Sequence, residues 1–234
     1  MTGEHSLIAA ISAHVERCIG KIAFVIHEIE SDAVHIDVHY VPARKARSFD
    51  LLVTSGMSQR PMTTPPEASE WRHAELVALL PPGWPLHSAA HAWPVHMLRD
   101  LAHFPHRSKT WLGCGHTIAD AEHPPRPYAP GTRLTSVFLH HSPMLPERFT
   151  SMQGPDGKKI SFLTVVPLYE QELQVKLRYG TAALLARLAA RGINDIIDPK
   201  RQSAVIEVGD GDGPPDGGAR ARRGGPWRLP DSIH

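Results

Sequence analysis

Two apolar runs, joined by a glycine corner and a proline-rich loop, constrain this chain more than any other feature of its sequence. The first run, residues 51–53, leads into Thr54-Ser55-Gly56-Met57-Ser58. The second run, residues 74–80, is stopped by two prolines. Short apolar runs bounded by turn residues are typical of strands that are covered on both faces. The sequence therefore predicts two buried strands, with Gly56 supplying backbone angles that a β-branched residue would resist.

A helix and a hairpin are predicted before this stretch. Apolar residues spaced three and four apart over residues 7–19 indicate one buried helix face, and Gly20 follows as a cap. Residues 22–29 and 34–41 are predicted to pair as a hairpin around Glu30-Ser31-Asp32. Side chains alternate along a strand, so the second arm has one apolar and one polar face. The apolar face carries Val34, Ile36, Val38 and Tyr40, and the polar face carries His35, Asp37 and His39.

The second half of the chain alternates between strand and helix patterns. The spacing predicts helices at residues 93–104, 169–179 and 182–190, with a break at Gly180-Thr181. Strands are predicted at residues 134–139, 149–152 and 160–166, the last two forming a hairpin around Gly154-Pro155-Asp156-Gly157 and ending at Pro167. Residues 107–131 have no period of their own and are predicted to be a long loop.

Length and composition indicate one domain followed by a tail. With 234 residues, 41% of them hydrophobic, the chain can bury one substantial core. The composition changes after Ala204 to a stretch rich in Gly, Pro and Arg that cannot bury enough apolar surface to order itself. We therefore predict a domain over residues 1–204 and a disordered tail over residues 205–234.

Charge and cysteine content exclude several classes of partner and compartment. The formal net charge is +1, so no overall field favours nucleic acid or an anionic membrane. The two cysteines, Cys18 and Cys114, are too few for a disulfide scaffold and lack zinc-finger spacing. The first residues carry no positive leader, and no window approaches the length of a membrane span. We expect a cytoplasmic protein with no cofactor and no nucleic-acid or membrane partner.

The polar face of the predicted hairpin is the sharpest metal-like feature. His35, Asp37 and His39 share one strand face, and imidazole with carboxylate can bind zinc or iron. Residues four apart on a strand stand about 13 Å apart, so one ion would need a further ligand such as His27. The favoured interpretation is a solvated strand face. The alternative is a metal-dependent hydrolase.

Other chemical candidates have weaker patterns. Cys114 with His116, or with His140 and His141, could form a nucleophile and base, but no strand-to-helix elbow or orienting carboxylate lies nearby. A structural loop cysteine is favoured, and the protein is not expected to be an enzyme. The chain has 16 histidines, so full protonation would take its formal charge from +1 to +17. We favour sequence bias over a sensing role for them.

A family resemblance accompanies these patterns. The matching segments are LVTSGMS at 52–58, Pro-Met at 61–62, AEL at 74–76, LPPGWP at 80–85 and WPVHMLRDLAHFPH at 93–106. They resemble the suppressor of fused domain family, and the resemblance continues to about Ala204. It implies an α+β fold with a central mixed β-sheet flanked by helices, and protein binding in place of catalysis. Stand-alone bacterial members resemble immunity proteins that bind and neutralise polymorphic toxins, which makes a cognate toxin domain the expected partner.

Two loops are predicted to supply the binding surface. Residues 55–67 and 107–131 are long and rich in Pro and Gly, which is typical of functional loops. Met57, Met62, Trp111 and Tyr128 are the predicted anchors, because aromatic and methionine side chains give large, adaptable contact areas. The alternative for Met57 and Met62 is burial under the corner.

Overall fold

The computed structural model describes residues 2–31, 33–120, 122–205 and 227–228. The predicted tail falls on residues outside this part, apart from residues 205 and 227–228. No helix in the described ranges is both long and apolar enough to cross a membrane.

One mixed sheet organises the fold. In the described part of the chain its order is β1-β2-β3-β4-β8-β6-β5-β9, and β7 pairs with β8 outside this path. The pair β4 and β8 is parallel and the other pairs are antiparallel. The strands are β1 (Phe24–Ile26), β2 (Asp37–Val41), β3 (Asp50–Ser55), β4 (Ala74–Leu80), β5 (Thr117–Asp120), β6 (Ser136–His140), β7 (Ser151–Gln153), β8 (Lys159–Leu168) and β9 (Trp227–Arg228). The predicted α+β class with a mixed central sheet is confirmed.

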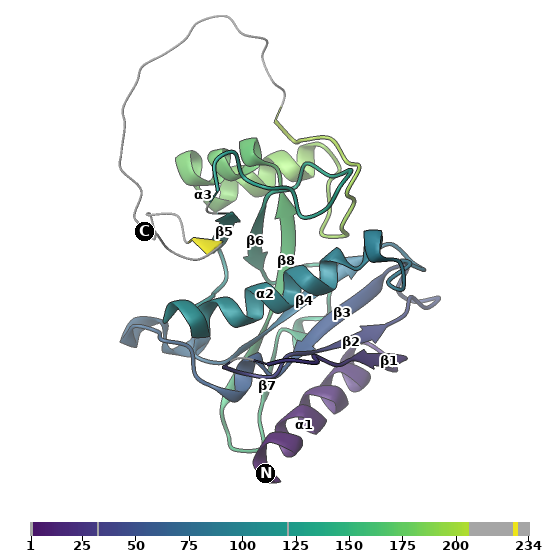
Figure 1. Cartoon of the computed structure of the whole chain (residues 1–234), viewed down its shortest axis with the longest axis vertical. Coiled ribbons are helices and arrows are strands. Elements are labelled where there is room, and N and C mark those ends of the chain that lie inside the picture. Colours follow the sequence, from purple (N-terminus) through teal and green to yellow (C-terminus); the bar gives the residue numbers. More distant parts are fainter. Residues whose placement is uncertain (1, 32, 121, 206–226, 229–234) are drawn as a thin grey trace, which may run out of the picture.

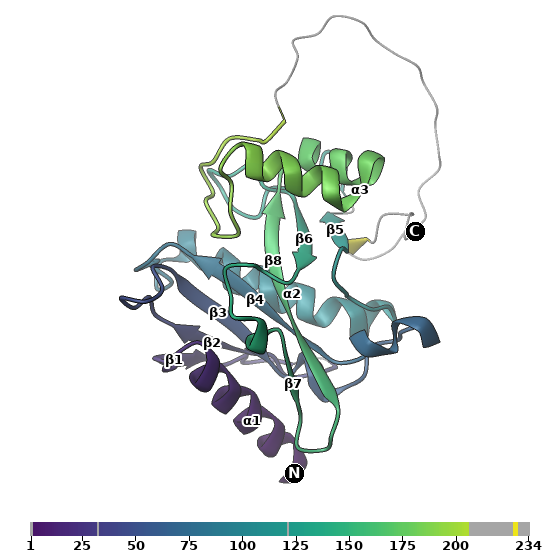
Figure 2. The same cartoon turned by 180° about the vertical axis from the view of Figure 1, so that it is seen from behind.

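Two helices cover opposite faces of β3 and β4. Helix α1 (Thr2–Cys18) packs Ile11 and Val15 into a cluster with Leu79. Helix α2 (Trp93–Ser108) packs Leu98 and Leu101 into a cluster with Leu76, Ala78 and neighbouring core residues on the other face. Figures 1 and 2 show the sheet between these helices. All residues of β3 and β4 are buried, which confirms the two buried strands predicted from the apolar runs.

Strand β8 extends beyond this layer and supports the third helix. Its second half pairs with β6, and Phe138, Val166 and Leu168 pack against Leu184 and Leu188 of α3 (Glu170–Ala190). Gly180 has φ 83° and ψ 175°, so the helix breaks where the sequence predicts. Helix α3 lies at the opposite end of the molecule from α1 (Figures 1 and 2).

Several boundaries differ from the prediction. The hairpin arms predicted at 22–29 and 34–41 form strands only over β1 and β2, and the strand predicted at 149–152 begins at Ser151, after a 3-10 turn over Glu147–Phe149. The predicted loop at 107–131 contains the last residues of α2 and the strand β5. Four residues give too short a pattern to recognise, and β5 forms because its edge pairs with β6, with Ile118 opposite Val137. Strand β8 also continues through Pro167 to Leu168, and the Pro167 carbonyl accepts a hydrogen bond from Arg201 Nη2 at 3.0 Å.

Candidate binding groove

A buried carboxylate holds the glycine corner in place. Glu75 of β4 is fully buried and accepts hydrogen bonds from Thr54 Oγ1 (2.6 Å), the Gly56 and Ser58 amides (3.0 Å each) and Ser58 Oγ (2.6 Å). Burial raises the pKa of Glu75, and these hydrogen bonds oppose the shift. Gly56 has φ 122°, and a Cβ there would lie 1.8 Å from the His35 carbonyl oxygen. The corner is therefore fixed against the start of β2.

The corner buries the two methionines that were predicted as partner anchors. Met57 is 0% exposed and Met62 is 3% exposed, and both belong to the core cluster under α2. His106 Nε2 lies 3.0 Å from the Met57 carbonyl oxygen, and the Leu112 amide donates to Met62 Sδ at 3.4 Å. Both methionine side chains are therefore inaccessible to a partner in this structure. Met57 begins the 3-10 turn Met57–Gln59 with its side chain buried.

The two aromatic anchors lie partly buried on the same cluster. The Trp111 ring lies 4.2 Å from the His116 ring, centroid to centroid, and Tyr128 stacks on Trp93 at 5.9 Å. Burial raises the pKa of Tyr128 well above its usual value. Both side chains pack against the core, so their role as partner anchors remains a prediction.

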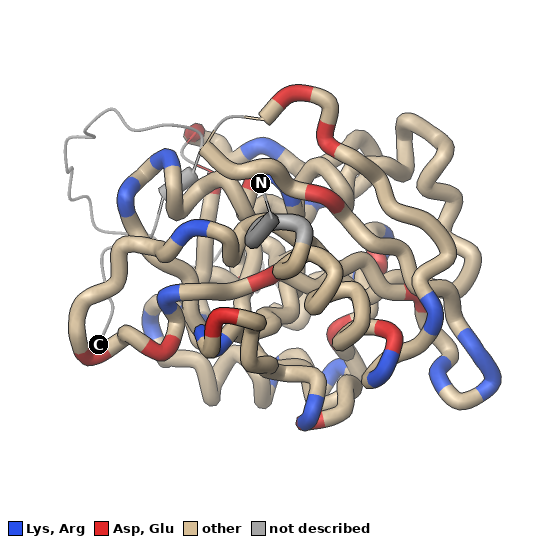
Figure 3. Tube along the Cα trace, turned by 90° about the horizontal axis from the view of Figure 1, so that it is seen from below, with Lys and Arg blue, Asp and Glu red and all other residues tan. Residues whose placement is uncertain are grey.

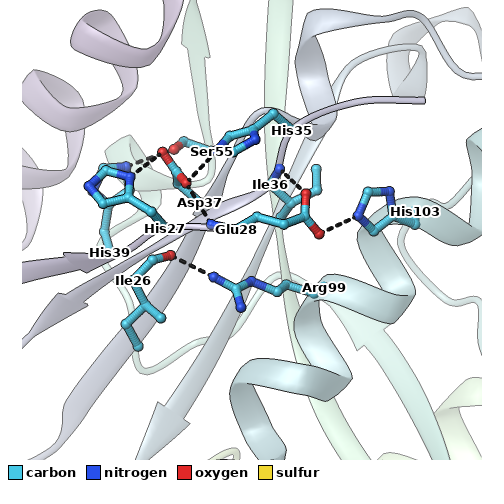
Figure 4. A network of polar contacts seen from close by, with 10 residues as sticks. All are labelled: Ile26, His27, Glu28, His35, Ile36, Asp37, His39, Ser55, Arg99 and His103. Atoms are coloured by element: carbon cyan, nitrogen blue, oxygen red, sulfur yellow. Dashed lines mark hydrogen bonds and ion pairs between the residues drawn. The ribbon is translucent and has the colours of Figure 1, made fainter. Parts of the chain in front are cut away.

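The polar face of the β1–β2 hairpin centres on Asp37. His27 Nδ1 lies 3.0 Å from Asp37 Oδ2, and His35 Nε2 lies 3.0 Å from Asp37 Oδ1 (Figure 4). The Glu28 amide also donates to Asp37 Oδ1 at 3.2 Å. Asp37 thus joins the two ends of the connection between β1 and β2.

A second carboxylate ties this connection to α2. Glu28 Oε1 lies 2.7 Å from His103 Nε2, and Glu28 Oε2 accepts from the Ile36 amide at 2.9 Å. Arg99 Nη2 donates to the Ile26 carbonyl oxygen at 2.8 Å, so α2 contacts the hairpin at two points (Figure 4). The hairpin connection is therefore positioned by bonds to its own strands and to α2.

The candidate metal ligands do not converge on one point. His39 Nε2 lies 2.9 Å from Ser55 Oγ, the side chain is 2% exposed, and desolvation lowers its pKa. His27 and His35 contact different oxygens of Asp37. Within the described ranges no group of three or more His, Cys, Asp or Glu side chains has metal-binding geometry. The solvated strand face favoured from the sequence is wrong for Asp37 and His39, because both side chains are buried, at 6% and 2% exposed, and hydrogen-bonded inside the protein. The hydrolase alternative gains no geometric support from the described residues.

A groove opens beside this network. Its volume is about 720 Å³, and its walls come from α1, the β1–β2 connection and the segment after the glycine corner. Ile8, Ala9 and Val34 supply apolar surface, while His27, His35 and Arg60 supply polar and positive groups. The same connection carries Ile29, which is 98% exposed. The predicted 55–67 loop thus contributes through Gln59 and Arg60 and not through its methionines.

Sequence reasoning missed this groove because its walls are far apart along the chain. Residues 8–9, 27–37 and 59–60 meet only after α1 packs against the sheet. No local pattern points to it, and Ile29 lies at the end of the first predicted strand arm.

The cysteine and histidine candidates are also apart. Cys114 is exposed and, within the described residues, makes no hydrogen bond, whereas Cys18 is buried with Sγ 3.9 Å from His14 Nδ1. His140 Nε2 lies 3.1 Å from Asp195 Oδ1. Burial lowers the pKa of His141. Among the residues that the structure describes, no nucleophile and base pair forms around Cys114.

Acidification is expected to destabilise the fold through His116. Burial, with a smaller effect from Lys176, lowers the pKa of His116 to about 4. The unfolded chain, with a histidine pKa of about 6.5, takes up the proton first, so stability is lost as pH falls from about 6.5 to about 4. At pH 5.5 the loss from one such histidine is at most about 1.4 kcal/mol. Urea melts of wild type and His116→Gln at pH 7.5 and 5.5 measure this loss of stability. If the two proteins lose the same free energy of unfolding between these pH values, His116 does not cause the loss.

Comparison with known proteins places the fold. A family model for Suppressor of fused protein (SUFU) matches residues 32–202. Similar solved structures include the Sufu-Fu complex (14% identity, 85% of this chain and 92% of that chain, TM-score 0.61). Another is a SUFU homolog from Neisseria gonorrhoeae (15% identity, 87% of this chain and 100% of that chain, TM-score 0.60). A third is Drosophila Suppressor of Fused (15% identity, 86% of this chain and 51% of that chain, TM-score 0.60), so the chain spans about half of the Drosophila protein. No curated protein matches. Because the family match covers most of the described domain, the chain belongs to the suppressor of fused family.

Proposed function

We propose that this chain binds a protein partner through the groove between α1 and the β1–β2 connection. The observation that carries the proposal is a groove lined by Ile8, Val34 and Arg60, together with the exposed Ile29 on the same β1–β2 connection, whose ends are hydrogen-bonded. An isolated apolar side chain on a positioned loop is a typical anchor for a protein surface. The expected partner segment presents an apolar pocket for Ile29 and a carboxylate for Arg60.

The charge distribution agrees with a local binding site. In Figure 3 the positions of Lys and Arg are interspersed along the trace with those of Asp and Glu, which fits the net charge of +1. Recognition then depends on shape and a few anchors and not on a long-range field. Membership of the family supports the same class of function, since one similar structure is that of the Sufu-Fu complex.

The finer proposal is that the partner is a polymorphic toxin domain, which the chain neutralises by direct binding in the cytoplasm. The fold similarity covers 100% of the Neisseria gonorrhoeae SUFU homolog and 87% of this chain. Neutralisation requires a well-shaped binding surface and no catalytic group, and the groove supplies such a surface.

Two substitutions are each expected to weaken partner binding at least tenfold: Ile29→Asp, which places a charge at the exposed apolar side chain, and Arg60→Glu, which reverses a charge in the groove. The test co-expresses the chain with the product of the adjacent gene and compares wild type, Ile29→Asp and Arg60→Glu by pull-down and by rescue of growth. Both side chains are exposed, so the variants should keep the wild-type melting temperature. Lys45→Glu, an exposed charge reversal in the β2–β3 turn, is the matched control.

Recovery of the partner by both groove variants at the wild-type level would remove the groove from the binding surface. Binding that depends on the groove without rescue of growth would retain protein binding and reject toxin neutralisation. Stoichiometric zinc in the purified protein, with hydrolysis lost in His35→Ala, would favour the enzyme alternative.

A further inference from the structure

The second half of α3 has an outer face that no other described element covers. Leu184 and Leu188 turn inward and are buried against β6 and β8. On the outer side Leu185 is 37% exposed, and Tyr179, just before the Gly180 break, is 56% exposed. Exposed alanines lie beside Leu185 along this half of the helix, at positions 182, 186, 189 and 190. The face is therefore apolar, shallow and open to close approach by another helix.

Unpaired positive charges flank this apolar surface. The guanidinium carbons of Arg178 and Arg187 lie 5.3 and 5.8 Å from the centroid of the Tyr179 ring, one contributed from each side of the Gly180 break. Cation–π contacts of this kind hold the arginines over the ring and leave their N–H groups available to solvent. The surface thus combines the Tyr179 ring with the guanidinium groups of Arg178 and Arg187, which lie over it.

The positive charge is local and uncompensated. Between Glu172 and Asp195 the sequence contains four cationic residues and no acidic residue. Within the described ranges none of the four forms an ion pair. They are Lys176, Arg178, Arg187 and Arg191. Residues 173–194 therefore carry a formal charge of +4, whereas the whole chain carries +1, and Glu170, Glu172, Asp195 and Asp198 lie on either side of this stretch in the sequence.

A pocket continues the face beyond the end of the helix. It has a volume of about 440 Å³, and its polar lining includes Arg191, Asn194, Asp198 and Ser203, with Ile193 and Ile196 among its apolar walls. Arg201, also in the lining, is held by Glu172 at 2.6 Å. Arg191 is thus placed where the helix face and the pocket meet.

We propose that the outer face of α3, residues 178–191, docks an acidic amphipathic helix from a protein partner. The apolar residues of that helix would contact Leu185 and the alanines, and its flanking carboxylates would pair with Arg178, Arg187 and Arg191. The helical segment after Gly180 is about 15 Å long, which accommodates about three turns of a partner helix. Charge complementarity selects an acidic partner, because in the part of the chain that the structure describes these cations form no ion pair with a carboxylate.

The same features argue against a membrane or a nucleic acid as the occupant. Two exposed large apolar side chains are too few to hold a helix in a bilayer interface, where a whole apolar face is needed. Phosphate backbones are bound by cations along an extended track, whereas these cations surround an apolar centre. The surface lies at the opposite end of the molecule from the groove, and this proposal does not depend on the groove (Figures 1 and 2).

A synthetic peptide tests the proposal without knowledge of the natural partner. The probe is a labelled 18-residue helical peptide with leucines at positions three and four apart and glutamates on both flanks. We expect the full chain to bind it, and the double variant Arg178→Glu with Arg187→Glu to bind at least tenfold more weakly by fluorescence anisotropy. The same peptide with lysine in place of glutamate should prefer the double variant. Raising the salt concentration should weaken the wild-type complex.

Matched variants separate charge from folding and from the groove. Leu185→Asp should also weaken binding, since it removes the apolar centre, and Lys45→Glu and Arg60→Glu should leave it unchanged. Melting curves confirm that each variant is folded. Absence of peptide binding, equal binding by the double variant, or tighter binding to duplex nucleic acid or to phosphatidylserine vesicles would each overturn the proposal. Concentration-dependent dimerisation that Leu185→Asp abolishes would assign the face to a second copy of the chain and overturn it as well.

Discussion

Replacing Glu75 by alanine is expected to destabilise the protein by about 3 to 5 kcal/mol, and to unfold the glycine corner first. The side chain is 0% exposed and accepts hydrogen bonds from Thr54, Gly56 and Ser58. Alanine would leave these buried donors without an acceptor, and each orphaned group costs about 1 to 3 kcal/mol before any relaxation. The lost side-chain volume would add a cavity at the base of the corner.

Urea unfolding at pH 7 measures this effect, with Glu70→Ala as the control. Glu70 lies five residues earlier on an exposed 3-10 turn, so its replacement should change stability by less than about 0.5 kcal/mol. Amide hydrogen exchange should report the largest loss of protection at Gly56 and Ser58. A cost under about 1 kcal/mol for Glu75→Ala would mean that water or neighbouring groups satisfy the corner without the carboxylate.

Leu76→Ala and Leu79→Ala are each expected to cost about 2 to 5 kcal/mol. Both side chains are 0% exposed, but they belong to different clusters, because Leu76 lies under α2 and Leu79 lies under α1. Each replacement removes apolar contacts and leaves a cavity in a separate layer. Since the two sites lie on opposite faces of the sheet, the double variant should lose nearly the sum of the single effects.

Leu185→Ala is the comparison for this pair, because Leu185 is 37% exposed and should cost much less. Thermal and urea melts of the three single variants and the double variant give the free energies. A cost below about 1 kcal/mol at either buried leucine would mean that the corresponding helix does not close its face of the sheet in solution.

The local patterns were sufficient to predict most elements. The runs at β3 and β4 were recognisable because both faces are buried, which requires nearly continuous apolar sequence. The break at Gly180 was recognisable because glycine adopts φ 83° without strain. The short strand β5 gave no such signal, since its pairing with β6 determines it.

What the sequence by itself determined was most of the strands and helices, the alternation of polar and apolar side chains along β2, and the family. Only the tertiary structure decided which polar and apolar side chains are buried in the core and which are exposed or line the groove. Met57 was suited equally to a core or an interface, and the Glu75 corner placed it inside at 0% exposure. The groove at Ile8, His35 and Arg60 exists because α1, the hairpin and the corner meet in space. Contacts between segments so distant along the chain depend on packing of the whole core, which no local spacing of residues specifies.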